Sequence, residues 1–166
     1  ASEDWATGAD AAVNVADMSG NGITVTLNAV PTSTDTTESV GYNSSYTFQA
    51  SDFAFNDSDS GDTLQGVTLK TLPVDGDLYL NNVAITATET FVSLADLNSS
   101  LLTYRPDNGG SGNGYASFTF TVNDGADDSV TPNTVTLNVA SPPPPAPTEP
   151  TPETSTDQVD GVEVTT

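Results

Sequence analysis

The chain has 166 residues and a formal net charge of −21, to which lysine and arginine contribute only two residues. This charge excludes the basic surfaces that bind nucleic acids and anionic membranes. No apolar run approaches the roughly 20 residues that are needed to span a bilayer. Because cysteine and histidine are absent, disulfides, thiolate nucleophiles, histidine-dependent serine triads and Cys/His zinc sites are excluded as well, and we do not expect an enzyme.

Residues 1–30 contain one predicted strand, at positions 23–27. Ile23, Val25 and Leu27 alternate with threonines, so they share one face of that strand. The segment is too short for a domain, and Pro31 ends its pairing. We therefore expect residues 1–30 to be the end of a preceding module or an added edge strand, and the chain to be a fragment of something longer.

Residues 31–141 are expected to form one all-β sandwich. A hydrophobic content of 35% supports one modest core, and short apolar stretches recur with turn residues between them. The expected strands cover residues 46–48, 64–72, 78–80, 83–85, 101–104, 115–122 and 135–139. Asn81 and Asn82 predict a hairpin turn because asparagine tolerates positive φ, and Ser93 is expected to cap a single helical turn over 93–97.

The clearest strand pattern lies at residues 115–122, where apolar and polar side chains alternate strictly. Strand geometry sends successive side chains to opposite faces. The residues predicted to face the core are Ala116, Phe118, Phe120 and Val122, and those predicted to face outward are Tyr115, Ser117, Thr119 and Thr121.

The composition changes abruptly after Ser141. Prolines dominate residues 142–152, which predicts an extended polyproline II stretch of about 35 Å, at about 3.1 Å per residue. We expect residues 142–166 to be a disordered proline-rich linker and the start of a following segment. The alternative function for the prolines is recognition by a proline-binding domain.

An acidic loop separates two apolar stretches. Asp57, Asp59 and Asp62 lie within six residues, and neither Lys70 nor Arg105 is adjacent in the sequence. Two carboxylates about 4 Å apart repel by roughly 1 kcal/mol in water and about 4 kcal/mol at the effective dielectric of a protein surface. Calcium suits such a loop, because it takes six to eight oxygen ligands in flexible geometry. The alternative is a solvated acidic turn, with aspartate and glycine chosen for backbone reasons.

Five motifs together resemble a known family. They are FAFNDSDSGDTL (53–64), VTL (67–69), GDLYLN (76–81), LLTYRP (101–106) and FTFTVNDG (118–125). As a set they look like the cadherin-like tandem repeat of large bacterial surface proteins, including RTX-type adhesins. The resemblance implies a seven-stranded, Greek-key, immunoglobulin-like sandwich that binds calcium near module junctions outside the cell.

The resemblance also implies calcium ligands in two loops. Asp57 and Asp59 match the Asp-x-Asp ligands that cadherins carry after the second strand, and Asp124 matches a ligand after the sixth. In a sandwich of this kind, these two loops lie at the same end. Asp62 lies in the first loop but has no firm counterpart in the family.

Further ligands are expected from the segment that enters the module. Asn28, Thr34 or Asp35 could contribute there, although this segment departs from the cadherin linker pattern of several aspartates and asparagines, which leaves the number of ions open. Asp127 and Asp128 are additional candidates, because they follow the second loop closely.

Other calcium motifs do not match. An EF-hand beginning at Asp57 requires glycine at its sixth position and glutamate at its twelfth, and these positions hold Asp62 and Thr68. The glycine-rich residues 109–115 begin like an RTX nonapeptide, but Gly114 stands where the aspartate ligand belongs and nothing repeats.

The sequence therefore predicts a calcium-stabilised spacer or adhesion module at a bacterial cell surface, whose partners are neighbouring modules of the same polypeptide. The alternatives are a module that binds surface glycans or proteins, with Tyr79, Tyr104 and Tyr115 as contacts, and an accessory domain of a secreted enzyme. Asp75 and Asp77 could mimic the two catalytic carboxylates of a glycosidase, but the sequence gives no sign of an aromatic-rich groove around them.

Overall fold

The computed structural model describes residues 27–147. The predicted strand at 23–27, except for Leu27, and the predicted segment at 148–166 lie outside the described residues. Residues 141–147 have no regular secondary structure and are exposed to solvent.

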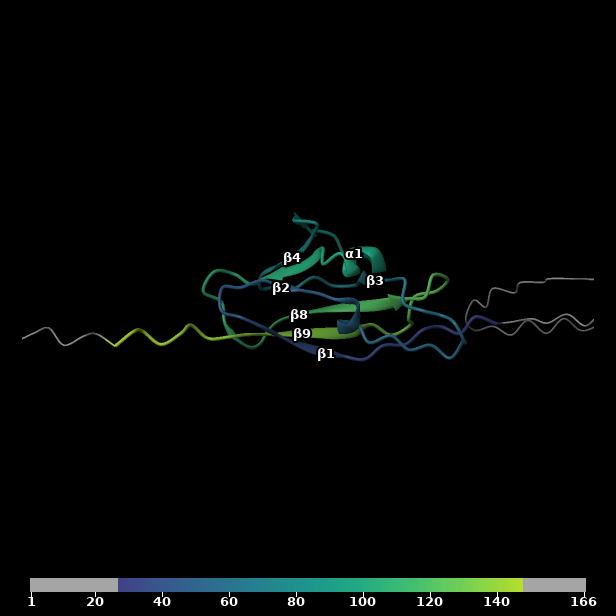
Figure 1. Ribbon diagram of the computed structural model, residues 1–166, viewed down its shortest axis with the longest axis horizontal. Helices are drawn as coiled ribbons and strands as arrows, with labels where there is room; N and C mark the ends of the chain where they lie inside the picture. Colours follow the sequence, from purple (N-terminus) through teal and green to yellow (C-terminus); the bar gives the residue numbers. More distant parts are fainter. Residues whose placement is uncertain (1–26, 148–166) are drawn as a thin grey trace, which may run out of the picture.

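The described chain forms two β-sheets packed face to face (Figure 1). The larger sheet has the order β1 (Thr36–Val40), β9 (Asn133–Val139), β8 (Gly112–Asn123), β3 (Gly66–Leu69) and β6 (Thr90–Ser93). The smaller sheet has the order β2 (Tyr46–Thr47), β7 (Leu102–Arg105), β4 (Asp77–Leu80) and β5 (Val83–Ala84). A 3-10 turn, η1 (Ala50–Asp52), and a short helix, α1 (Leu94–Asn98), complete the described elements.

The predicted all-β sandwich is confirmed, but the strand count differs from the prediction. Residues 27–147 contain nine strands instead of seven. The two strands that the sequence did not predict are β1 and β6, which form the two edges of the larger sheet. All neighbouring strands pair antiparallel except β1 and β9, which run parallel.

The core lies between the two sheets. Phe118 and Phe120 project into it from β8 and are at most 1% exposed, as the alternation predicts. Phe48 lies 5.5 Å from Phe118 and Phe53 lies 4.9 Å from Phe120, measured between ring centroids in edge-on geometry that suits aromatic rings. Phe53 thus fixes the chain just before the acidic loop.

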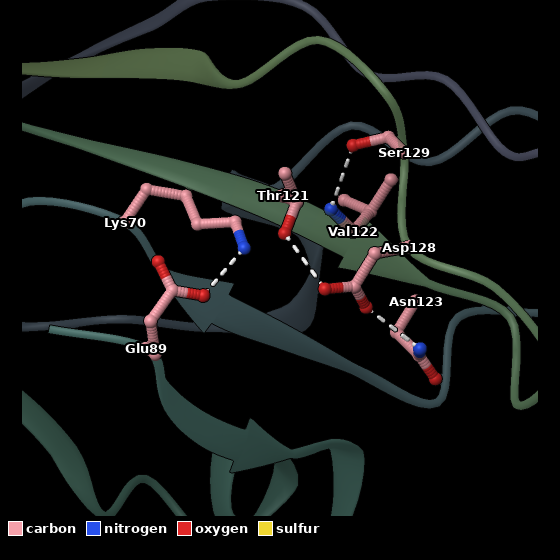
Figure 2. Close-up of polar contacts among 7 residues, drawn as sticks. All are labelled: Lys70, Glu89, Thr121, Val122, Asn123, Asp128 and Ser129. Carbon is pink, nitrogen blue, oxygen red and sulfur yellow. Dashed lines mark hydrogen bonds and ion pairs between the residues drawn. The ribbon is translucent and has the colours of Figure 1, made fainter.

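One residue predicted to face solvent is buried. Thr121 is only 2% exposed. The loop after β8 turns back and pairs beside the end of that strand, through the bridge between Asn123 and Asp128, and this brings the Asp128 side chain against Thr121. Figure 2 shows the contacts that hold this loop: the Thr121 hydroxyl donates to Asp128 Oδ2 at 3.2 Å, and the Asn123 amide donates to Asp128 Oδ1 at 2.7 Å. The Val122 N–H also donates to Ser129 Oγ at 3.2 Å.

Two local predictions are confirmed. Asn81 and Asn82 have φ values of 49° and 62° and form the two-residue turn between β4 and β5. Ser93 caps α1: its hydroxyl accepts the Asp96 N–H at 3.1 Å, and the Asp96 carboxylate accepts the Ser93 N–H at 3.2 Å. This reciprocal capping box satisfies backbone donors at the start of the helix.

Candidate metal centre

The acidic loop 57–62 and the loop after β8 meet at one end of the sandwich, as predicted. The cause is strand pairing: β3 and β8 are antiparallel, and Gly66 at the start of β3 lies opposite Asn123 at the end of β8. The loop that precedes β3 and the loop that follows β8 must therefore emerge side by side. The incoming chain at Asn28 and Ala29 contacts both loops.

Three carboxylates come together at this end. Asp57, Asp62 and Asp124 each place one carboxylate oxygen within 4.8 Å of those of the other two. Asp57 Oδ1 accepts the Asp59 N–H at 2.7 Å, which shapes the loop. Asp57 Oδ2 is buried and has no hydrogen-bond partner among the described residues. Leaving a buried polar atom without a partner is costly, so a hydrogen-bond donor or a cation bound beside this oxygen would stabilise the loop.

Asp124 is held by its own loop. Its Oδ1 accepts the N–H groups of Ala126 and Asp127, each at 2.7 Å, and its Oδ2 accepts from the Asn28 amide at 3.3 Å. Burial raises the pKa of Asp124, but the backbone N–H groups of Asp127 and Ala126 and the Asn28 amide outweigh it, so the pKa lies below its ordinary value. Asp124 therefore presents a fixed, negatively charged carboxylate at this end of the sandwich.

The entering chain ties the two loops together. The Asn28 amide donates to Asp127 Oδ2 at 3.1 Å as well as to Asp124, and the Ala29 N–H donates to Asp59 Oδ2 at 2.7 Å. Asp59 therefore holds the entering backbone and lies outside the carboxylate triad. Nothing in the sequence indicates the role of Ala29, because any residue other than proline supplies the same N–H.

Asp35 is not brought into this group. Its Oδ1 accepts the Thr134 N–H at 2.8 Å and the Asn133 amide at 3.3 Å. Asp35 directly precedes β1, and β1 pairs with β9. Its carboxylate therefore accepts hydrogen bonds at the start of β9. Asp128, another candidate, is likewise occupied by Thr121 and Asn123.

No positive charge relieves the repulsion among the three carboxylates. Lys70 Nζ pairs with Glu89 at 2.6 Å, while Arg105 donates to Asn82 and lies 4.1 Å above the Tyr79 ring. These are the only lysine and arginine in the chain. Burial, followed by the charges of Asp57, Asp59 and Asp124, raises the pKa of Asp62 above its ordinary value of 3.8.

An open hollow of about 360 Å³ lies beside the triad. Asn28, Asp59, Ser60 and Asp62 line it, so every lining side chain carries an oxygen. Hard oxygen donors of this kind, at an open and partly solvated position, suit a calcium ion that keeps some of its water. They do not suit zinc, which prefers nitrogen and sulfur ligands.

The raised pKa of Asp62 predicts a pH effect on the calcium-free protein. A carboxyl whose folded pKa exceeds its unfolded pKa stabilises the fold below the unfolded value, and this contribution disappears as the pH rises through the folded value. We therefore expect Asp62→Asn to flatten the fall in stability just above pH 3.8, the ordinary value. Urea melts across this range in EGTA measure the effect, and identical pH profiles for the two proteins would contradict it.

The tyrosines proposed as sugar contacts do not form one exposed face. Tyr104 is fully buried, and its hydroxyl donates to the Asp75 carbonyl at 2.7 Å. The Tyr79 ring is covered by Arg105, and the Tyr115 hydroxyl donates to Asp107. Tyr104 therefore cannot contact a surface ligand in this structure.

Comparisons of the chain with protein-family models, with curated proteins and with solved structures find no match. No helix among residues 27–147 is long and apolar enough to cross a membrane. The resemblance of the motifs and the geometry of the acidic loops are thus the grounds on which a function can be proposed.

Proposed function

We propose that this chain is a calcium-stabilised spacer or adhesion module of a large bacterial surface or secreted protein, with a cadherin-like Greek-key fold. Its calcium ligands are Asp57, Asp62 and Asp124, and its partners are neighbouring modules of the same polypeptide. The function is structural: a bound ion stiffens the end of the module where the chain enters.

The unpartnered Asp57 Oδ2 is the observation that carries this proposal. A solvated acidic turn would direct its carboxylates into water, yet this oxygen is buried and belongs to a carboxylate that clusters with those of Asp62 and Asp124. A divalent cation would satisfy it and neutralise the repulsion among the three groups at once. Asn28 could join them by turning its amide oxygen toward the ion.

The shape of the module supports a spacer role. The described chain enters at the end that carries the carboxylates and leaves as the proline-rich segment at the opposite end (Figure 1). A module with entry and exit at opposite ends extends a tandem array by its full length. The exposed prolines at 142–147 suit a semi-rigid connection.

Calcium titration by calorimetry tests the site directly. Wild-type protein should release or absorb heat as the site fills, with a dissociation constant of about 10⁻⁴ to 10⁻³ M, the range of extracellular calcium modules. The double variant Asp57→Asn with Asp124→Asn should lose this signal, because it removes two of the three carboxylates of the triad.

A matched control comes from the opposite end of the module. Asp77 is an exposed aspartate at the start of β4, opposite Arg105 at the end of β7. Asp77→Asn removes the same charge as each site substitution and should leave calcium binding unchanged. Absence of a binding signal in the wild-type protein, or equal loss in the control, would refute the proposal.

A further inference from the structure

Two Asn-Gly steps lie near the end of the module that is opposite the carboxylate triad. Asn108-Gly109 follows β7, and Asn113-Gly114 lies at the start of β8. Both asparagines are exposed, and both glycines have positive φ, 81° at Gly109 and 59° at Gly114. A third such step, at residues 21 and 22, lies outside the described residues.

An Asn-Gly step is chemically reactive because the glycine places no side chain beside its own nitrogen. That nitrogen, after losing its proton to hydroxide, attacks the asparagine Cγ; the new N–C bond closes a cyclic imide, and the side-chain nitrogen leaves as ammonia. Water then adds to either imide carbonyl and opens the ring to aspartate or isoaspartate. The reaction consumes water alone and needs no redox partner.

In this structure each attacking nitrogen donates a hydrogen bond to the side chain of an asparagine that is distant in the sequence. The Gly114 N–H donates to the side-chain oxygen of Asn138 on β9 at 2.6 Å. The Gly109 N–H donates to the side-chain oxygen of Asn43, in the loop between β1 and β2, at 2.9 Å. A donated proton is harder to remove, and a nitrogen held toward an acceptor is turned away from attack. The arrangement is the same at both steps although the acceptors come from different parts of the fold.

We infer that Asn108 and Asn113 are sites of spontaneous deamidation whose rates are set by the side-chain amides of Asn43 and Asn138. Each conversion adds one negative charge near the end of the module from which the proline-rich segment leaves. Residue 113 lies in the irregular stretch between Gly112 and Ala116, where the β8–β9 register shifts. An isoaspartate there adds its extra backbone carbon outside the regular ladder, so the sandwich tolerates the product.

The test follows both sites in one experiment on the full chain. Wild type, Asn138→Val and Asn43→Gly are incubated in mildly alkaline buffer, and peptide mass spectrometry measures conversion at residues 108 and 113. Valine suits strand β9, and glycine suits position 43, where φ is 49°. Loss of one hydrogen bond should raise the rate about two- to twelvefold. We expect Asn138→Val to accelerate conversion at 113 alone, and Asn43→Gly at 108 alone.

The conservative variant Asn138→Asp separates the hydrogen bond from a general loosening of the fold. Its carboxylate can still accept the Gly114 N–H, so conversion at 113 should stay as slow as in the wild type. The inference is overturned if residue 113 converts as fast in Asn138→Asp as in Asn138→Val. It is also overturned if neither Asn138→Val nor Asn43→Gly changes any conversion rate, or if one of them accelerates both sites equally.

Discussion

Calcium is expected to raise the melting temperature of this protein, and EGTA to reverse the rise. With a dissociation constant of about 10⁻⁴ to 10⁻³ M, a tenfold excess of calcium over that constant adds about 1.4 kcal/mol to the free energy of unfolding. For a domain of this size the shift in melting temperature is on the order of 5 °C. Differential scanning calorimetry in calcium and in EGTA measures it.

The effect of Asp62→Asn on the melting temperature should have opposite signs in EGTA and in calcium. Without calcium, the substitution removes a carboxylate whose pKa is raised by burial and by the charges of Asp57, Asp59 and Asp124, so the variant should melt above the wild type. With calcium, it removes a ligand, so the variant should melt below the wild type. A residue in a merely solvated turn would produce neither effect.

Two controls make this result specific. Asp77→Asn should shift the melt equally in calcium and in EGTA, because Asp77 lies at the opposite end of the module. Magnesium at the same concentration should stabilise less, since it requires stricter octahedral geometry than this open loop offers. A wild-type melt that is the same with and without millimolar calcium would count against the metal site.

Phe53→Ala is expected to be the most damaging single substitution near the site. Phe53 is fully buried and packs on Phe48 and Phe120, with ring centroids 5.6 and 4.9 Å away. Removal of a buried phenylalanine costs about 3–5 kcal/mol through lost burial and the cavity left behind. Total stabilities are about 5–15 kcal/mol, so much of the folding free energy should be lost. Chemical denaturation measures the change.

Val83→Ala is the matched control for the core. Val83 lies in the edge strand β5 and is 70% exposed, so its truncation should change the free energy of unfolding by no more than about 0.5 kcal/mol. Similar losses for Phe53→Ala and Val83→Ala would mean that Phe53 does not hold the core as its packing indicates.

Local features of the fold could be predicted because their causes are local. The alternation at 115–122 follows from the twofold period of a strand, the Asn81-Asn82 turn from tolerance of positive φ, and the Ser93 cap from a short side chain that reaches a backbone N–H. Thr121 was the exception. Its burial is accompanied by the pairing of a later loop beside the end of β8, and strand alternation carries no information about that loop.

The candidate site could be predicted only in part. Clustering in the sequence places Asp57, Asp59 and Asp62 in one loop, but it does not distinguish the triad members Asp57 and Asp62 from Asp59, which holds the Ala29 N–H. Asp35 was expected nearby, yet it bonds to the start of β9. The contact of Asn28 with Asp127 also depends on where the entering chain lies.

By itself the sequence determined the class of chemistry. A chain of net charge −21 without cysteine or histidine can offer a metal only oxygen ligands, and its alternating strands require an all-β core. The tertiary structure decided which oxygens meet, because Asp57 and Asp62 reach Asp124 only through the antiparallel register of β3 and β8. The period of a strand is a local property of the chain, whereas the neighbours of a carboxylate depend on how distant strands pair.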